Sequence, residues 1–283
     1  MDTNYTVLAR KYRSQDFKSL IGQDVLVKTL TTAIETSRIA HAYIFTGIRG
    51  TGKTSTARIF AKALNCLSSD RATANPCGEC ENCRAIAAGQ HIDVMEIDAA
   101  SHTGVDNMRD ILDAAQYRPT NGRYKVYIID EVHMLSIGAF NALLKTLEEP
   151  PAHVIFILAT TEVHKIPVTI LSRCQRYDFR RITVDTIADR LKELTDAEGM
   201  PVEEKALRYV AKAGDGSMRD ALSLLDQCAS AASGPVTAEL VYSALGLAGE
   251  KRTAQLMDAV SRHDAKTALE LFSGLYAGGK DIA

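Results

Sequence analysis

Hydrophobic positions along the chain follow two patterns that alternate. Short apolar runs, rich in Ile, Val and aromatic residues, are separated by longer stretches in which apolar residues recur at helical spacing. The short runs are typical of strands buried on both faces, and the longer stretches are typical of amphipathic helices. Strands are predicted over residues 43–46, 91–98, 124–131, 154–159 and 175–179. Helices are predicted over residues 25–37, 55–65, 105–116 and 136–147, with a turn and short helix over 167–171.

From about residue 181 the pattern becomes purely helical. Helices are predicted over residues 184–198, 203–213, 218–231 and 237–245. We therefore expect an α/β domain over residues 1–180, with a parallel sheet flanked by helices, and a small all-helical domain over residues 181–246. A further helical stretch begins near residue 250, and its apolar face has little left to cover it. The residues of that face are Leu269, Leu271, Phe272 and Leu275. The chain is thus expected to end inside a third helical domain, residues 247–283.

Composition limits the classes of function. The 283 residues are 46% hydrophobic, with a net charge of −2 and no basic tail, so any contact with nucleic acid must come from a local surface or from an assembly. No apolar run approaches the roughly 20 residues of a membrane span, and the polar N-terminus has no apolar run after it. We expect a cytoplasmic chain whose six cysteines do not form disulfides.

A phosphate-binding motif follows the first predicted strand and precedes a predicted helix. It reads Gly47-Ile48-Arg49-Gly50-Thr51-Gly52-Lys53-Thr54, followed by Ser55. The glycines let the backbone bend so that successive N–H groups point at an anion, and the helix N-terminus adds to the attraction. Lys53 supplies a charge for the β- and γ-phosphates, and Thr54 can place its hydroxyl on Mg²⁺. A glycine-rich turn that binds nothing is the alternative. The expected nucleotide-binding residues are Gly47, Gly50, Thr51, Gly52, Lys53, Thr54 and Ser55.

Two adjacent carboxylates end the apolar strand over residues 124–131. Asp130 should emerge beside Thr54, where it would support Mg²⁺. Glu131 can accept a hydrogen bond from a water molecule aimed at the γ-phosphate. An acidic pair after a strand is common, but its position behind a phosphate-binding loop favours the second half of a nucleotide site.

Four cysteines between the first and second halves of this site have the spacing of metal ligands. They are Cys66, Cys77, Cys80 and Cys83. Two Cys-x2-Cys steps in a polar, turn-rich loop bring three thiolates around one point, and Cys66 can complete a tetrahedron. Four sulfur ligands suit structural Zn²⁺. An iron–sulfur cluster and a redox dithiol are the alternatives. Cys174 and Cys228 are expected to be ordinary thiols away from the metal.

Two further segments each allow two interpretations. The basic, aromatic arm over residues 8–17 is either a solvated N-terminal segment or a cover over the nucleotide base. The loop over residues 99–104 is either an ordinary strand-to-helix connection or the entry to a helix whose N-terminal N–H groups bind a phosphate.

Taken together, these residues resemble the clamp-loader ATPases of the gamma/tau family of bacterial DNA polymerase III, within the wider AAA+ superfamily. The resemblance covers nearly the whole chain, and the four-cysteine insert is its most specific marker. The other markers are the arm over residues 8–17, the phosphate-binding motif, the segment 96–101, Asp130-Glu131, Thr160-Thr161, Ser172-Arg173-Cys174 and Gly216-Ser217-Met218-Arg219-Asp220. The helical domains would then be a lid domain and the start of a collar domain for oligomerisation.

The resemblance also implies roles for single residues. Thr161 resembles the sensor that reads the γ-phosphate, and Arg219 resembles the sensor arginine that reaches the same nucleotide in cis. Arg173 resembles the arginine finger given to a neighbouring subunit, although an arginine in such a turn could also be a plain surface charge. The arm would bind the nucleotide through Arg10 and Tyr12.

The loop after Ala99-Ala100-Ser101 is a candidate for contact with DNA, although the sequence leaves the DNA-contacting residues open. Some relatives carry basic residues there, where this chain has His102 and Gly104. DNA contact would then rest on backbone N–H groups and on Ser101 or Thr103.

The function implied is ATP hydrolysis that loads a sliding clamp onto primed DNA. ATP, Mg²⁺ and Zn²⁺ would be the cofactors. Other clamp-loader subunits, the sliding clamp and primer-template DNA would be the partners, in a hetero-oligomeric ring, and the present chain alone could be monomeric. One alternative is a nucleotide-binding structural subunit that hydrolyses nothing, but such subunits typically lose the lysine or acid that this chain keeps as Lys53, Asp130 and Glu131. A Holliday-junction or recombination motor is another, and the four-cysteine insert argues against it.

Overall fold

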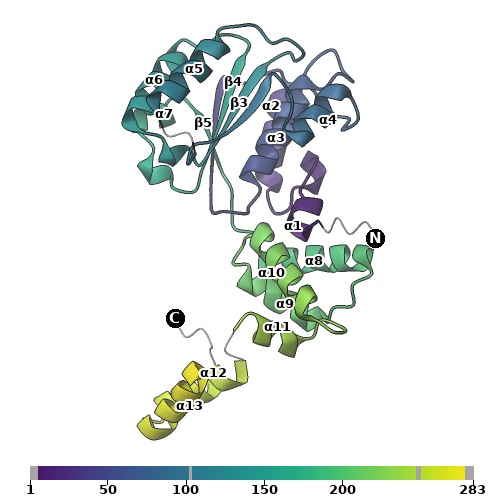
Figure 1. The fold of residues 1–283 in the computed structure, drawn as a ribbon, viewed down its shortest axis with the longest axis vertical. Coiled ribbons are helices and arrows are strands. Elements are labelled where there is room, and N and C mark those ends of the chain that lie inside the picture. Colours follow the sequence, from purple (N-terminus) through teal and green to yellow (C-terminus); the bar gives the residue numbers. More distant parts are fainter. Residues whose placement is uncertain (1–5, 102–103, 247–249, 278–283) are drawn as a thin grey trace. The chain divides into compact units, whose positions relative to one another are not determined.

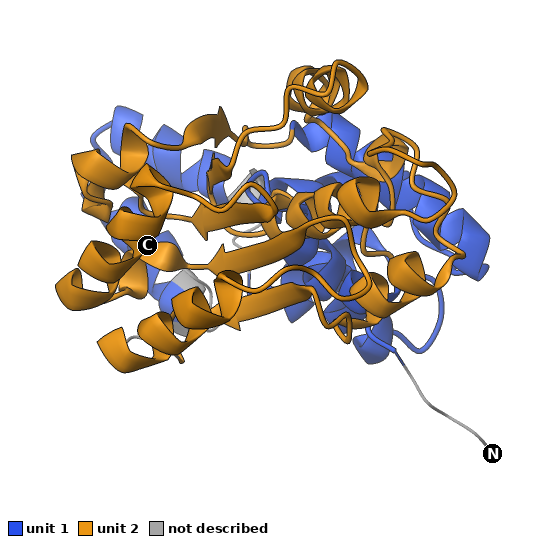
Figure 2. Ribbon diagram, turned by 90° about the horizontal axis from the view of Figure 1, so that it is seen from above, with its two compact units in different colours: residues 1–11, 183–283 blue, residues 12–182 orange. Residues whose placement is uncertain are grey.

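The computed structural model describes residues 6–101, 104–246 and 250–277, and the chain divides into two compact units (Figure 2). One unit comprises residues 12–182. The other comprises residues 1–11 together with residues 183–283. Each unit is described by itself.

The unit of residues 12–182 is built on a parallel sheet of five strands, in the order β2-β3-β4-β1-β5 (Figure 1). The strands are β1 (Ala42–Thr46), β2 (Val94–Asp98), β3 (Lys125–Asp130), β4 (Val154–Thr160) and β5 (Gln175–Asp178). Thr46 pairs with Thr160, and Asp98 pairs with Asp130. This register aligns the carboxyl ends of the strands, so the polar residues that follow β1, β3 and β4 meet at one edge of the sheet.

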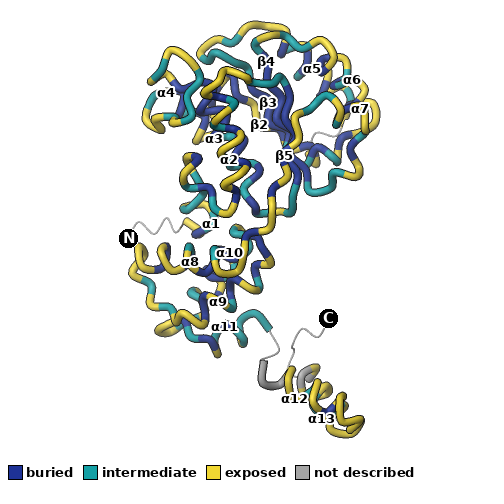
Figure 3. Tube along the Cα trace, turned by 180° about the vertical axis from the view of Figure 1, so that it is seen from behind, coloured by how far each residue is buried: buried dark blue, intermediate teal, exposed yellow. Residues whose placement is uncertain are grey.

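Both faces of the sheet are apolar, which explains the continuous hydrophobic runs of the strands. In β4, Ile155 and Ile157 pack into the core on one face, while Phe156 and Leu158 pack into the core on the other. The central strands β1 and β4 are buried along their whole length (Figure 3), and Tyr43, Ile44 and Phe45 of β1 are fully buried. The edge strands β2 and β5 are partly exposed.

Helices cover each face of the sheet and form one hydrophobic core with it on each side (Figure 1). On one face lie α2 (Asp24–Glu35), α3 (Lys53–Asn65) and α4 (Glu81–Ala88). On the other face lie α5 (Val105–Ala115), α6 (Ile137–Glu148) and α7 (Val168–Leu171). Short 3-10 turns occur at η1 (Phe17–Ser19), η2 (Val132–Met134) and η3 (Val163–Lys165).

The segment that precedes α2 is fixed against α3. Arg13 Nε donates to Ser55 Oγ at 3.1 Å, and the buried Lys62 donates to the carbonyl of Gln15. Burial lowers the pKa of Lys62. Phe17 completes the contact by packing into the same core as α3.

The other unit is helical. Its elements are α1 (Leu8–Lys11), α8 (Val184–Glu198), α9 (Glu204–Ala213), α10 (Met218–Ala231), α11 (Ala238–Ala244), α12 (Glu250–Ser261) and α13 (Ala265–Ala277). The N–H of Leu8 donates to Asp226 at 2.7 Å, and Lys11 pairs with Glu198 at 2.5 Å, so α1 packs with the helices of this unit. The described residues of α12 and α13 are largely exposed (Figure 3). Leu269 and Phe272 are among the exposed large apolar side chains of α13.

The structure differs from the sequence-based elements at three places. Residues 91–93 form a turn rather than the start of β2, and Ile92, which made the segment look strand-like, is 66% exposed. The helix α4 occupies part of the insert for which the sequence predicts a loop. The last helical stretch is broken into two helices near His263, whose φ of 56° is left-handed.

Candidate nucleotide site and four-cysteine cluster

The phosphate-binding loop has the backbone shape that its glycines predict. Gly47, Gly50 and Gly52 have φ values of 144°, 77° and 102°. A Cβ atom on Gly47 would lie 2.6 Å from the carbonyl oxygen of Phe179, so only glycine fits there. Gly52 is the residue before α3, and α3 therefore begins at the end of the loop, with its N-terminal N–H groups available to an anion.

Lys53 lies inside this loop rather than on its surface. Its side chain is buried, and Nζ donates to the carbonyls of Gly47 at 2.8 Å and Ile48 at 2.9 Å. Burial lowers the pKa of Lys53, and the nearby carboxylates of Glu131 and Asp130 oppose this effect. The ammonium group therefore lies within the electrostatic reach of both acids.

The carboxyl end of β3 brings the acidic pair to the loop. Asp130 Oδ2 accepts a hydrogen bond from Thr54 Oγ1 at 2.7 Å. Both are oxygen ligands of the kind that Mg²⁺ prefers, and their contact fits a shared position at a metal ion. Asp130 Oδ1 accepts the N–H of Glu131 at 3.0 Å, which fixes the turn that follows β3.

Glu131 is held by the end of the neighbouring strand. Its Oε2 accepts hydrogen bonds from Thr161 Oγ1 at 2.9 Å and from the Thr161 N–H at 3.2 Å. Glu131 has φ 47° and ψ 45°, a left-handed conformation that is unfavourable for a non-glycine residue. Strain of this kind at the end of a central strand is typical of functional sites.

One residue of this network had no role assigned from the sequence. His133, in η2, lies with Nδ1 3.3 Å from Glu131 Oε2 and 3.0 Å from Thr160 Oγ1. Its Nε2 lies 3.2 Å from Glu162 Oε1. A single histidine two positions after Glu131 gives no sequence signal of its own, because only the fold brings β4 beside it.

The remaining predicted site residues lie elsewhere. Arg173 bonds to Glu148 Oε1 at 2.7 Å and to the carbonyl of Thr169 at 2.8 Å, at the ends of α6 and α7. Arg219 lies on α10 and Arg10 on α1, both in the other unit, so their roles at the nucleotide stay predictions.

The arm and the expected DNA loop also stay untested. Tyr12 lies in the same unit as the phosphate-binding loop. Ser101 Oγ donates to Asp98 at 3.1 Å, and Gly104 precedes α5. His102 and Thr103 lie outside the described residues.

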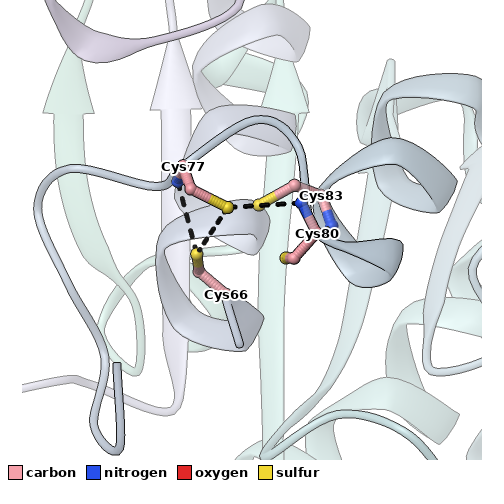
Figure 4. A group of neighbouring side chains, drawn as sticks. All are labelled: Cys66, Cys77, Cys80 and Cys83. Carbon is pink, nitrogen blue, oxygen red and sulfur yellow. Dashed lines mark hydrogen bonds between the residues drawn. The ribbon is translucent and has the colours of Figure 1, made fainter. Parts of the chain in front are cut away.

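The four predicted metal ligands form a cluster (Figure 4). The sulfur atoms of Cys66, Cys77, Cys80 and Cys83 all lie within 4.8 Å of one another, with Cys66 and Cys77 3.6 Å apart. Zn–S bonds of about 2.3 Å place the sulfurs of a tetrahedral site about 3.8 Å apart, so the cluster needs only small adjustments to hold one ion. Cys174 and Cys228 lie outside this group.

Backbone N–H groups point at the sulfurs, as they do in metal-binding turns. The N–H groups of Cys77, Cys80 and Cys83 donate to the sulfurs of Cys66, Cys77 and Cys80 at 3.3, 3.3 and 3.4 Å. The N–H groups of Cys80 and Glu79 lower the pKa of Cys77 to about 6, whereas burial raises the pKa of Cys83. A cation would remove this conflict, because it stabilises all of the thiolates together.

The cluster is joined to the sheet through the C-terminal end of α3. Arg123, which precedes β3, donates to the carbonyls of Leu64, Cys66 and Ser69. Asn82 of α4 donates to the carbonyl of Asn65 at 2.9 Å. These contacts supply partners to carbonyls that the helix end leaves without them.

Sequence profiles of two families match the chain. Residues 22–183 match the family described as "DNA polymerase III, delta subunit", and residues 186–234 match "DNA polymerase III clamp loader subunit, ATPase lid domain". The chain is 45% identical over 276 residues to DNA polymerase III subunit gamma of Buchnera aphidicola subsp. Acyrthosiphon pisum, covering 98% of this chain and 76% of that protein. The chain belongs to the gamma/tau family of DNA polymerase III subunits.

Longer members of the gamma/tau family are similar over the same region. The chain is 51% identical to DNA polymerase III subunit tau of Bacillus subtilis, covering 99% of this chain and 49% of that protein. It is 47% identical to the tau subunit of Escherichia coli K12, covering 98% of this chain and 43% of that protein. The chain thus spans about half the length of the first of these curated relatives.

The solved structures that are similar share the AAA+ fold. The Thermotoga maritima RuvB Holliday junction branch migration motor matches with a TM-score of 0.60 and 19% identity, covering 89% of this chain and 80% of that one. A variant of the same RuvB protein matches with a TM-score of 0.60 and 18% identity, over the same shares. At these identities the likeness shows the fold alone. The predicted AAA+ domain, helical lid and four-cysteine cluster are confirmed. Among the described residues, no helix has the length and apolar character to cross a bilayer.

Proposed function

We propose that the chain is an ATP-hydrolysing subunit of a replicative clamp loader, which uses ATP to place a sliding clamp on primed DNA. The observation that supports this best is the meeting of three elements at one edge of the sheet. The phosphate-binding loop supplies Lys53 and Thr54, β3 supplies Asp130 and Glu131, and the residue after β4, Thr161, holds Glu131. Membership of the gamma/tau family supplies the clamp-loading context.

The residues have distinct tasks in the proposed reaction. The loop N–H groups and Lys53 hold the β- and γ-phosphates, so the terminal phosphoryl group is fixed in place. Thr54 and Asp130 hold Mg²⁺, which neutralises charge on the phosphates when it is bound. Glu131 accepts a hydrogen bond from the attacking water and aligns it for in-line transfer. Thr161 sets the position of Glu131 and reads the γ-phosphate.

Other proposed roles concern the assembly. Arg173 acts as an arginine finger on the nucleotide of a neighbouring subunit, and Arg219 reads the nucleotide of its own subunit. The arm, with Arg10 and Tyr12, covers the base. Residues 181–246 form the lid domain and residues 247–283 belong to a collar domain that joins the subunits into a hetero-oligomeric ring. Residues 247–249 and 278–283 lie outside the described residues.

The four cysteines are proposed to hold one structural Zn²⁺ ion. Four thiolate donors without a histidine or a free coordination position suit zinc in a closed site. Its task is to fold the insert of residues 66–83 and fix it on the end of α3, in a cytoplasmic protein whose thiols stay reduced.

Steady-state ATP hydrolysis by the full-length protein in its complex, with and without sliding clamp and primed DNA, tests the proposal. We expect clamp and DNA together to stimulate hydrolysis. Lys53→Ala should abolish hydrolysis and the rise in melting temperature that ATP·Mg²⁺ causes in the parent protein. A subunit that only binds nucleotide would show the same ATP-induced rise in the parent but no hydrolysis above background under any condition.

A further inference from the structure

The imidazole of His133 lies between two carboxylates at the nucleotide edge of the sheet. Its side chain is 7% exposed, with Nδ1 3.3 Å from Glu131 Oε2 and Nε2 3.2 Å from Glu162 Oε1. The two acids come from different strands, since Glu131 follows β3 and Glu162 follows β4. His133 therefore links the ends of two neighbouring strands at the point where Glu131 must be held.

Each ring nitrogen of His133 has neighbours that fix the position of the ring. Nε2 faces Glu162 Oε1 at a distance of 3.2 Å. Nδ1 lies 3.3 Å from Glu131 Oε2, and its hydrogen-bond partner is Thr160 Oγ1. Thr160 Oγ1 lies 3.0 Å from the same nitrogen and is completely buried, which holds the ring in its plane.

The contacts with Glu131 are made to only one of its two carboxylate oxygens. Thr161 and His133 both approach Oε2. Within the described residues no donor binds the other oxygen, Oε1. A carboxylate fixed by one oxygen leaves the second oxygen with a set direction and room to accept a hydrogen from water.

Glu162 is the anchor of this arrangement. Its N–H donates to Thr160 Oγ1 at 3.0 Å, and its carboxylate bonds to Lys165 at 2.8 Å. The hydrogen bond from Lys165 lowers the pKa of Glu162, so its carboxylate stays ionised beside His133. His133 thus rests on a partner that is itself fixed by the backbone of β4 and by η3.

We propose that His133 is a positioning residue for Glu131: its buried ring lies against Oε2, so that Oε1 points at the attacking water. The inference rests on the proposed ATP hydrolysis. It concerns a residue that acts through Glu131 and touches neither the nucleotide nor the water. The left-handed backbone of Glu131 gives a reason for such a support, because an unfavourable conformation persists only where its surroundings fix it.

The test compares His133→Asn with His133→Gln in the full-length protein and its complex. The amide of Asn can place a polar atom near the position of Nδ1, and the longer Gln places one near Nε2. His133→Gln and His133→Ala should lower kcat by on the order of 10²-fold, the effect of moving a reacting group by about 1 Å. His133→Asn should stay within about fivefold of the parent. The affinity for a non-hydrolysable ATP analogue should be unchanged in all three.

A second comparison separates this inference from the proposed function. Glu131→Gln should lower kcat by roughly 10²–10⁴-fold, and adding His133→Ala to it should cost little more, because both act at one step. Equal losses of kcat in His133→Asn and His133→Gln would overturn the role of His133. So would a double variant whose fold-loss of kcat equals the product of the losses in Glu131→Gln and His133→Ala. If Lys53→Ala and Glu131→Gln leave hydrolysis unchanged, the proposed function itself is wrong. Circular dichroism and melting of each variant verify the fold.

Discussion

Asp93 should be one of the most sensitive positions for the stability of the nucleotide-binding unit. Its carboxylate is 3% exposed and accepts the N–H groups of Thr120, Asn121 and Gly122 at 2.6–3.0 Å, which ties β2 to the turn before β3. Each hydrogen bond to a charged group contributes about 1.5–3 kcal/mol. Thr120 and Asn121 are exposed, so in a variant without the carboxylate water can bond to their N–H groups and offset part of this loss. We expect Asp93→Ala to lower the free energy of unfolding by roughly 2–4 kcal/mol.

The loss can be measured by urea unfolding and by melting of the full chain followed by circular dichroism. For a unit of this size it corresponds to a fall of roughly 5–15 °C in melting temperature. Asp110→Ala, at an exposed position of α5, is the control and should change stability by less than about 0.7 kcal/mol. Similar small losses in both variants would refute the view that the carboxylate holds this turn.

The pH dependence gives a second check. Burial alone would raise the pKa of Asp93, but the N–H groups of Thr120, Gly122 and Asn121 outweigh it and hold the pKa below its ordinary value. A group with a lowered pKa in the folded state stabilises above its unfolded pKa, about 3.9, and the contribution is lost as pH falls through the folded pKa. The difference between parent and Asp93→Ala should be constant from about pH 8 to 5 and shrink below about pH 4. A difference that grows as pH falls would contradict this reasoning.

Three further changes test the site. Gly47→Ala should weaken ATP binding and lower the melting temperature, because its Cβ would meet the backbone behind the loop, whereas Gly89→Ala, with positive φ but open space, should leave ATP binding unchanged. Removal of metal with a chelator should expose residues 66–83 to hydrogen exchange before the sheet, and elemental analysis should find one zinc per chain. Arg173→Ala and Lys53→Ala proteins, each inactive, should regain hydrolysis when mixed in the full-length complex, because one contributes the finger and the other the phosphate-binding loop.

Each of these has an outcome that contradicts it. Unchanged ATP affinity in Gly47→Ala would mean that the crowded position is not part of the binding loop. Iron, or no metal in freshly purified protein, would rule out the zinc assignment. Mixed complexes that form but stay inactive would show that Arg173 does not act in trans.

The central elements and the phosphate site were predictable because their signals are local. A strand, a glycine-rich turn and a helix are contiguous around Lys53, and the acidic pair ends an apolar run. The helix α4 was missed because the cysteine spacing suggested a loop, although Cys80 accepts the N–H of Cys83 and begins that helix. The partners of His133 and Arg173 could not be found, because they depend on which strands and helices lie side by side rather than on nearby residues.

The position of β1 inside the sheet has a consequence for synthesis on the ribosome. β1 is the first strand made, yet its neighbours are β4 and β5, and the latter ends roughly 130 residues after it. At about 5–20 residues per second, the apolar side chains of Tyr43, Ile44 and Phe45 wait on the order of ten seconds before either neighbour is complete. Pairing across such separations is also slow in itself. The strand that leads into the phosphate-binding loop therefore stays unpaired on the nascent chain for several seconds, and during that time its apolar residues are open to chaperones.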